Sequence, residues 1–237
     1  MKSILQRAAG NSTLLDNVRD LTIVVVGILV ALWAEGEWQK RQEIALVNHA
    51  LAQIARGLEH DIEDISGNLN RARLGYEAAE WFQANRQAET DNTQDLRDAI
   101  RNLGNCSVLN LDSSAYIMLK NSGSLRLIEN KELLQQISSV YESRTYFVAV
   151  HKADCENSID VFALLAPYIK STIDPTSQSI IPLIEDVPNP QGLFEDQVLV
   201  NHIMALGTVR IMVINVVEPH LNHTKKLRDA ILIELSD

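Results

Sequence analysis

Few side chains in this chain of 237 residues have the type and spacing that chemistry requires. Cys106 and Cys155 could close a disulfide, but two reduced, buried cysteines fit the sequence equally well, and two are too few for a four-cysteine metal site. His220 and His223 have the HxxH spacing that places two ligands on one helical face. A zinc site needs further ligands, and no nearby cysteine or carboxylate set supplies them. We therefore interpret these histidines as polar surface residues.

An acidic cluster, EHDIED, occupies residues 59–64. Carboxylates are the usual ligands of divalent cations in proteins. However, Ile62 and Ile65 continue an apolar stripe of helical spacing through the same segment. The sequence therefore favours carboxylates on the solvated faces of one helix, namely Glu59, Asp61, Glu63 and Asp64.

The common catalytic motifs are absent from the sequence. There is no GxxxxGK[ST] phosphate loop, no GxGxxG turn, no HExxH and no GxSxG elbow. The net charge of −10, from 21 Lys and Arg against 31 Asp and Glu, disfavours nucleic acid as a partner. We predict a chain that is not an enzyme, has no catalytic, cofactor-binding or metal-binding residues and binds no nucleic acid.

The elements that carry these side chains are predicted to be helices. Five of the six prolines lie between Pro167 and Pro190 and the sixth is Pro219, so the first 166 residues lack the strongest helix breaker. The hydrophobic content of 46% excludes a disordered chain. We expect an all-α protein whose N-terminal transmembrane helix continues into a long helix and an extramembrane helical bundle. The expected parts are a short N-terminal segment at 1–13, a transmembrane helix at 14–38 and a helical domain at 39–237.

The transmembrane prediction is based on LTIVVVGILVALWA at 21–34, which carries no charge. Fourteen residues are too few to cross a bilayer, but residues 14–38 form a helix of about 37 Å. A buried core helix and a cleavable signal peptide are the alternatives. We favour a membrane span because the run is apolar on every helical face. The residues predicted to anchor it and to pack it against a neighbouring helix are Leu21, Gly27, Ala31, Trp33 and Trp38.

The orientation in the membrane is predicted from lysines and arginines near the span. Three such residues precede it and two follow it, a slight bias that places the N-terminus in the cytoplasm. The main domain would then be periplasmic, on a single-pass protein of the bacterial inner membrane. Gly27 and Ala31 form a small-xxx-small pair that lets another transmembrane helix approach closely.

Beyond the span, apolar residues recur at gaps of three and four, from Ile44 to Leu69. This helical stripe predicts packing within a bundle, with a coiled coil to a second copy as the alternative. Gly57, Gly67 and Gly75 could each allow a bend. Further helices are expected at 96–103, ending at a left-handed Gly104, and at 113–121.

Two longer helices follow in the sequence. The first is expected to begin after an N-cap at Asn130 and to bury Ile159 and Phe162 on its way to about residue 170. The second begins near Phe194 and has the length of a membrane span. Arg210 would cost about 2.5 to 3.5 kcal/mol at the centre of a bilayer, so we predict a bundle helix that Pro219 bends or restarts.

The prolines concentrate in an arm at residues 171–193, predicted to be irregular. Long irregular segments commonly bind something or lie along a surface. Docking against the helical body is one expectation and contact with a partner the other. The candidate contact residues are Ile180, Ile181, Pro182, Leu183 and Ile184.

Two stretches resemble a bacterial family of membrane-anchored proteins of unknown function. The run Gly27 to Leu32 followed by Trp38 is similar to the family's Gly-Ile-Leu-Ile-Ala-Leu anchor. The stretch YIMLKNSGSLRLIENKELLQQISSVYE is similar to its helix, Ser-Gly turn and helix unit. The chain departs from the pattern at Glu35-Gly36-Glu37, where the family has a Gln/Asn-rich stretch. The resemblance implies a topology and names no reaction.

From these observations we expect an accessory or scaffolding subunit of a larger membrane complex, with the lipid bilayer and other integral membrane subunits as partners. A second copy of the chain is a further candidate partner. The alternative is a membrane-anchored sensor or ligand-binding module, which would need a pocket with converging polar groups.

Overall fold

The computed structural model describes residues 2–86, 93–172 and 182–236, and within the first helix it describes the side chains of Arg19 and of residues from Leu21 onward. The chain is 84% helical with almost no strand, which confirms the all-α class. The α-helices of the described residues are α1 (Lys2–Ala84), α2 (Gln94–Gly104), α3 (Ser114–Asn121), α4 (Lys131–Leu165), α5 (Pro190–Glu195) and α6 (Gln197–Glu234). Two 3-10 helices, η1 (Ser124–Leu127) and η2 (Ala166–Tyr168), and two strands, β1 (Lys170–Thr172) and β2 (Leu183–Asp186), complete them.

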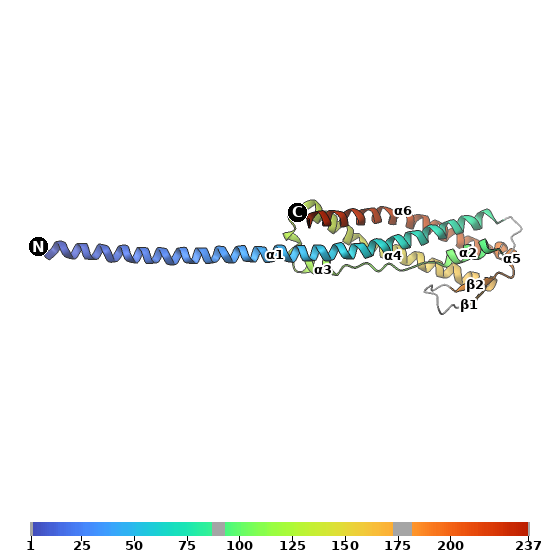
Figure 1. Ribbon diagram of the computed structural model, residues 1–237. Coiled ribbons are helices and arrows are strands. Elements are labelled where there is room, and N and C mark those ends of the chain that lie inside the picture. Colours follow the sequence, from blue (N-terminus) through green and yellow to red (C-terminus); the bar gives the residue numbers. More distant parts are fainter. Residues whose placement is uncertain (1, 87–92, 173–181, 237) are drawn as a thin grey trace.

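Helix α1 is 83 residues long, about 125 Å at the usual helical rise. Its N-terminal part extends alone from the body of the molecule, and its C-terminal part is one wall of a bundle (Figure 1). The helix passes through Gly57, Gly67 and Gly75 without a break, although glycine would have permitted one. It also passes the predicted domain boundary at residue 38, so the apolar segment and the bundle share one continuous helix.

The bundle has four sides. Helices α1, α4 and α6 form three of them, and the fourth is not one continuous helix. Helix α6 runs antiparallel to both partners and packs along each of them (Figure 1). Between α1 and α4, the fourth side contains α2, then an extended segment at residues 105–113, then α3. In the middle of the bundle, this single extended segment therefore occupies the place that a helix would fill.

The apolar stripe of α1 forms the core, as its spacing predicts, from Val47 to Phe82. Three clusters follow one another along the bundle. The first lies nearest the free part of α1 and includes Leu51, Leu58, Ile137 and Leu227; the middle one includes Ile65, Leu69, Val213 and Val217; the last includes Ile100, Leu103, Leu165 and Ile203. Ile44, the first residue of the predicted stripe, is exposed because the bundle begins one turn later.

Several helix ends follow local sequence signals. The predicted N-cap Asn130 is confirmed, since its Oδ1 accepts from the backbone nitrogen of Leu133 at 3.1 Å. Helix α2 ends at Gly104 as expected, but this glycine is not left-handed. It is needed because a Cβ there would lie 2.7 Å from the ring of Phe162. The only left-handed residue among those described is Gly123, after α3.

Four expectations for the C-terminal half of the chain need correction. Helix α4 stops at Leu165, where the chain tightens into a 3-10 turn containing Pro167, and Ile159 is 62% exposed rather than buried. Helix α6 continues through Pro219 in one piece, so the expected restart does not occur. The two ends of the proline-rich arm are not irregular, because β1 and β2 pair as an antiparallel ribbon.

Two isoleucines of α4 provide a matched test of this packing. Ile137 is fully buried and Ile159 is exposed. We expect I137A to lower the free energy of unfolding by about 2 to 4 kcal/mol and I159A to change it by less than about 0.5 kcal/mol. Urea denaturation followed by circular dichroism measures both. Equal losses for the two variants would contradict the placement of α4.

Candidate functional site

The apolar part of α1, from Leu21 to Trp38, is the first candidate site. Its residues are all exposed, including Gly27, Ala31 and Trp33. The most apolar window of this helix has a mean hydropathy of 1.7 and none of it is buried, so the helix could span a membrane. A buried core helix, one of the alternatives from the sequence, is not what the structure shows. At Gly27 a Cβ would meet nothing within 4 Å, which leaves its surface open to a neighbouring helix.

Helix α6 is comparably apolar, with a mean hydropathy of 1.6, but 39% of its most apolar window is buried within the bundle. Its Arg210 has no exposed surface at all. The chain itself therefore contacts α6 along much of its length, in contrast to the free part of α1.

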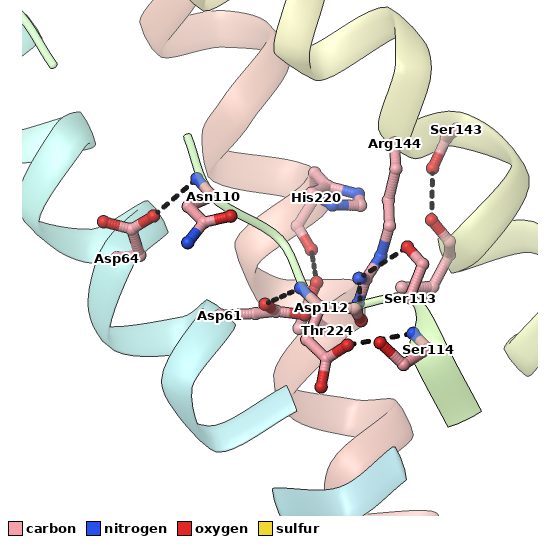
Figure 2. Close-up of polar contacts among 11 residues, drawn as sticks. Asp61, Asp64, Asn110, Asp112, Ser113, Ser114, Ser143, Arg144, His220 and Thr224 are labelled. Atoms are coloured by element: carbon pink, nitrogen blue, oxygen red, sulfur yellow. Dashed lines mark hydrogen bonds and ion pairs between the residues drawn. The ribbon is translucent and has the colours of Figure 1, made fainter. Parts of the chain in front are cut away.

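A buried ion pair joins α1 to α4 at the middle of the bundle (Figure 2). Arg144 of α4 donates to the Asp61 carboxylate of α1 and to the backbone oxygen of Asp112, and it donates to Ser113 Oγ at 3.1 Å. Asp61 in turn accepts from the backbone nitrogen of Asp112 at 3.0 Å. One turn further along, Asp64 accepts from the backbone nitrogen of Asn110 at 3.0 Å. The extended segment is thus attached to both helices by its own backbone.

The electrostatics of this pair follow from its burial. Asp61 is 1% and Arg144 5% exposed. Burial raises the pKa of Asp61, and the nearby Arg144 charge opposes that shift. The Arg144 guanidinium also lies 3.8 Å from the ring centre of Tyr141, whose pKa burial raises to about 12. The prediction that the acidic cluster is solvated is therefore wrong for Asp61, although Glu59 and Glu63 are exposed.

A second buried arginine joins α6 to the rest of the distal bundle. Arg210 donates to Asp154 at 3.2 Å and to Ser158 Oγ at 2.8 Å, both on α4. It also donates to three backbone oxygens at the end of α2, those of Asn102, Leu103 and Asn105, at 2.7 to 3.1 Å. The last carbonyls of a helix have no intrahelical donor, so Arg210 caps α2 as well as pairing with Asp154.

Gly75 creates the space for this guanidinium. A Cβ at Gly75 would lie 1.1 Å from Nη1 of Arg210, so any side chain here would displace the arginine. Sequence reasoning identified Gly75 as a flexible position and Arg210 as an obstacle to membrane insertion. The lone charge within the apolar run of α6 was the signal that a buried partner existed, but the sequence could not identify Asp154 as that partner.

The two cysteines adjoin the same centre. Cys106 follows Asn105 and Cys155 follows Asp154, and the structure joins them in a disulfide with their Cα atoms 5.2 Å apart. The bond ties the start of the extended segment to α4 across 49 residues of sequence. Of the two states left open by the sequence, the structure has the bonded one.

Two histidines are buried, and neither forms an ion pair with another described residue. His220 stacks on Phe147 with the ring centres 3.7 Å apart, and burial, followed by the Arg144 charge, lowers its pKa to about 4. Burial likewise lowers the pKa of His151 to about 4. The prediction of a surface HxxH pair is wrong for His220, while His223 is exposed. In the described ranges, no group of three or more His, Cys, Asp or Glu side chains is placed to hold a metal ion.

The proposed contact residues of the proline-rich arm divide into three groups. Ile180 and Ile181 lie outside the described residues. Ile184 is 3% exposed and packs in the chain's own distal core, so as a partner contact it is wrong. Leu183 is exposed on β2 and Pro182 is half-buried. Alternation along β2 explains the difference, because successive side chains point to opposite faces.

No family model, curated protein or solved structure matches this chain. The similarity to the membrane-anchored bacterial family stays a prediction.

Substitution of Gly75 tests the Arg210 centre. We expect G75A to lower the free energy of unfolding by about 3 kcal/mol or more, because the methyl group displaces the guanidinium and leaves Asp154 buried without its partner. The matched control is G67A on the same helix, where a Cβ would have an ordinary 3.6 Å contact and helix propensity alone should stabilise by up to about 1 kcal/mol. Urea denaturation compares the two, and an equally stable G75A would contradict the geometry.

Acidification is expected to destabilise the bundle through His151 and His220. An unfolded histidine titrates near 6.5, above the folded pKa of about 4, so the unfolded state binds more protons between these values. The free energy of unfolding should therefore fall by about 2 kcal/mol per histidine between pH 7.5 and pH 5. Burial raises the pKa of Asp61 and of Asp154, which acts in the opposite direction.

Urea denaturation at both pH values checks this dependence. The H151Q/H220Q double variant should lose most of it, and H202Q, at an exposed position, should keep it. A double variant with the slope of the unmodified chain would show that other groups determine the acid sensitivity.

Proposed function

We propose that this chain is a non-enzymatic accessory or scaffolding subunit of a larger bacterial membrane protein complex, anchored by one transmembrane helix. The observation that carries the proposal is the contrast within α1, where the residues from Leu21 to Trp38 are mostly apolar and all exposed and the part from Val47 onward is the wall of a packed bundle. Exposed apolar surface on this scale requires a bilayer or a protein partner. Respiratory, photosynthetic, transport and envelope complexes all fit.

The partners follow from the surface of the membrane helix. Lipid would cover most of it, and Gly27 and Ala31 offer a neighbouring transmembrane helix a close approach. Integral membrane subunits, or a second copy of the chain, are therefore the proposed partners. Because α1 is continuous, contacts made in the membrane would fix the direction in which the bundle extends from it.

The proposed location is the inner membrane, with the N-terminus in the cytoplasm and the bundle in the periplasm. The disulfide between Cys106 and Cys155 supports this orientation, since such bonds persist in the oxidising periplasm and are rare in the cytosol. The slight excess of lysine and arginine before the span supports the same orientation.

Purification from native membranes tests the proposal. We expect the tagged full chain, extracted in mild detergent, to migrate as a defined complex with integral membrane subunits. G27I/A31I should insert equally well and lose that complex, because the larger side chains prevent close helix packing. V24I, elsewhere on the same exposed segment, is the matched control and should retain it. A wild-type chain that migrates as a free monomer would contradict the proposal.

Protease treatment of spheroplasts tests the orientation separately. A periplasmic bundle should be cleaved from outside, and its cysteines should react with a thiol reagent only after reduction. Protection of the bundle from the protease would reverse the proposed orientation.

A further inference from the structure

The middle of the fourth side contains an open depression. The extended segment is thinner than the helix it replaces, and between it and α1 lies a space of about 490 Å³, within the size range of small-molecule sites. Its walls are formed by His60, Glu63, Asp64, Gly67 and Arg71 of α1 and by Asn110 of the segment. None of these residues belongs to the apolar core, so the lining is polar and carries both signs of charge.

Arg71 is the unusual member of this lining. Its Nε is buried and has no hydrogen-bond partner, and within the described part of the chain no hydrogen bond or ion pair engages its guanidinium. The group lies beside Gly67, since a Cβ there would be 3.6 Å from Nη2 of Arg71. A buried donor without an acceptor is costly, and a carboxylate is the acceptor that best matches the guanidinium fork.

His151 of α4 is a second group of this kind. It is 2% exposed, and its Nε2 has no partner. It lies near enough to both Asp64 and Arg71 for their charges to act on its pKa. Two side chains at one place in the bundle thus have buried nitrogens that the described residues leave unsatisfied.

The negative groups lie one helical turn from the Arg71 guanidinium. Glu63 and Asp64 precede Gly67 by four and three residues, about 5 Å along the helix axis. A simple anion would be repelled by these carboxylates and a simple cation by Arg71. The arrangement suits a ligand with both charges a few ångströms apart.

We propose that this depression binds a small zwitterion of the α-amino acid class, with its carboxylate on Arg71 and its ammonium group on Glu63 and Asp64. The proposal is independent of the membrane complex, since the site lies wholly within the bundle.

Thermal unfolding of the purified full chain in detergent tests the site. The probes are glycine and each common L-amino acid at 10 mM, with sodium acetate and methylammonium chloride as the two half-ligands. At ten times its dissociation constant an amino acid should raise the melting temperature by about 3 to 5 °C, and each half-ligand by less than 1 °C. Isothermal titration calorimetry then measures the affinity for the amino acid with the largest shift.

Two variants and one matched control locate the binding. R71M should lose the shift, and the matched control R73M should retain it, since Arg73 is exposed on the same helix and pairs with Glu218. E63Q, an exposed change that leaves the core intact, should weaken binding at least tenfold even if R71M fails to fold. No shift with any amino acid would overturn the proposal. An equal shift with acetate, or an R73M variant that also loses binding, would overturn it as well.

Discussion

The ion pair between Arg210 and Asp154 is the interaction on which the distal bundle depends. A guanidinium with no exposed surface has lost its hydration, and it regains hydrogen bonds only if Asp154, Ser158 and the last carbonyls of α2 are all in place. These partners come from α4 and from the end of α2, and Arg210 itself lies on α6, so the network joins three helices that are far apart in the sequence. Any shift of α2, α4 or α6 along its axis would leave a buried charge without partners, so the network specifies the register of the helices as well as their contact.

The extended segment depends on the same principle. It has no helical hydrogen bonds of its own, and within residues 105–113 only Cys106 and Leu109 are buried. Arg210 and the disulfide hold one end, and Arg144 with Asp61 holds the other. Polar attachments at both ends, together with Leu109 in the middle core cluster, therefore hold the segment along α1. The cost of this solution is a thinner wall, with an open depression beside it.

The sequence predicted most of what apolar spacing and capping determine. The stripe from Val47 onward, the N-cap at Asn130 and the bundle position of α6 all follow from local patterns. The buried polar groups could not be predicted in the same way. Asp61 looks like its exposed neighbours Glu59 and Glu63, and only Arg144, 83 residues later, makes it different. Gly75 was recognised as special for the wrong reason, because its role is to make space for a side chain from α6.

Arg71 differs from the two buried arginines, because it is only half-buried and no acceptor among the described residues contacts its guanidinium. Arg210 is surrounded by acceptors, and Arg144, whose Nε is also unpartnered, has both of its terminal nitrogens engaged. An unsatisfied buried polar group costs about 1 to 3 kcal/mol, and the same region contains a second one at His151. Folding alone would favour an apolar residue at the buried position of His151. The structure surrounds Arg210 with acceptors and supplies none for Arg71, which lies beside an open depression. A ligand from outside is the simplest source of the missing acceptor.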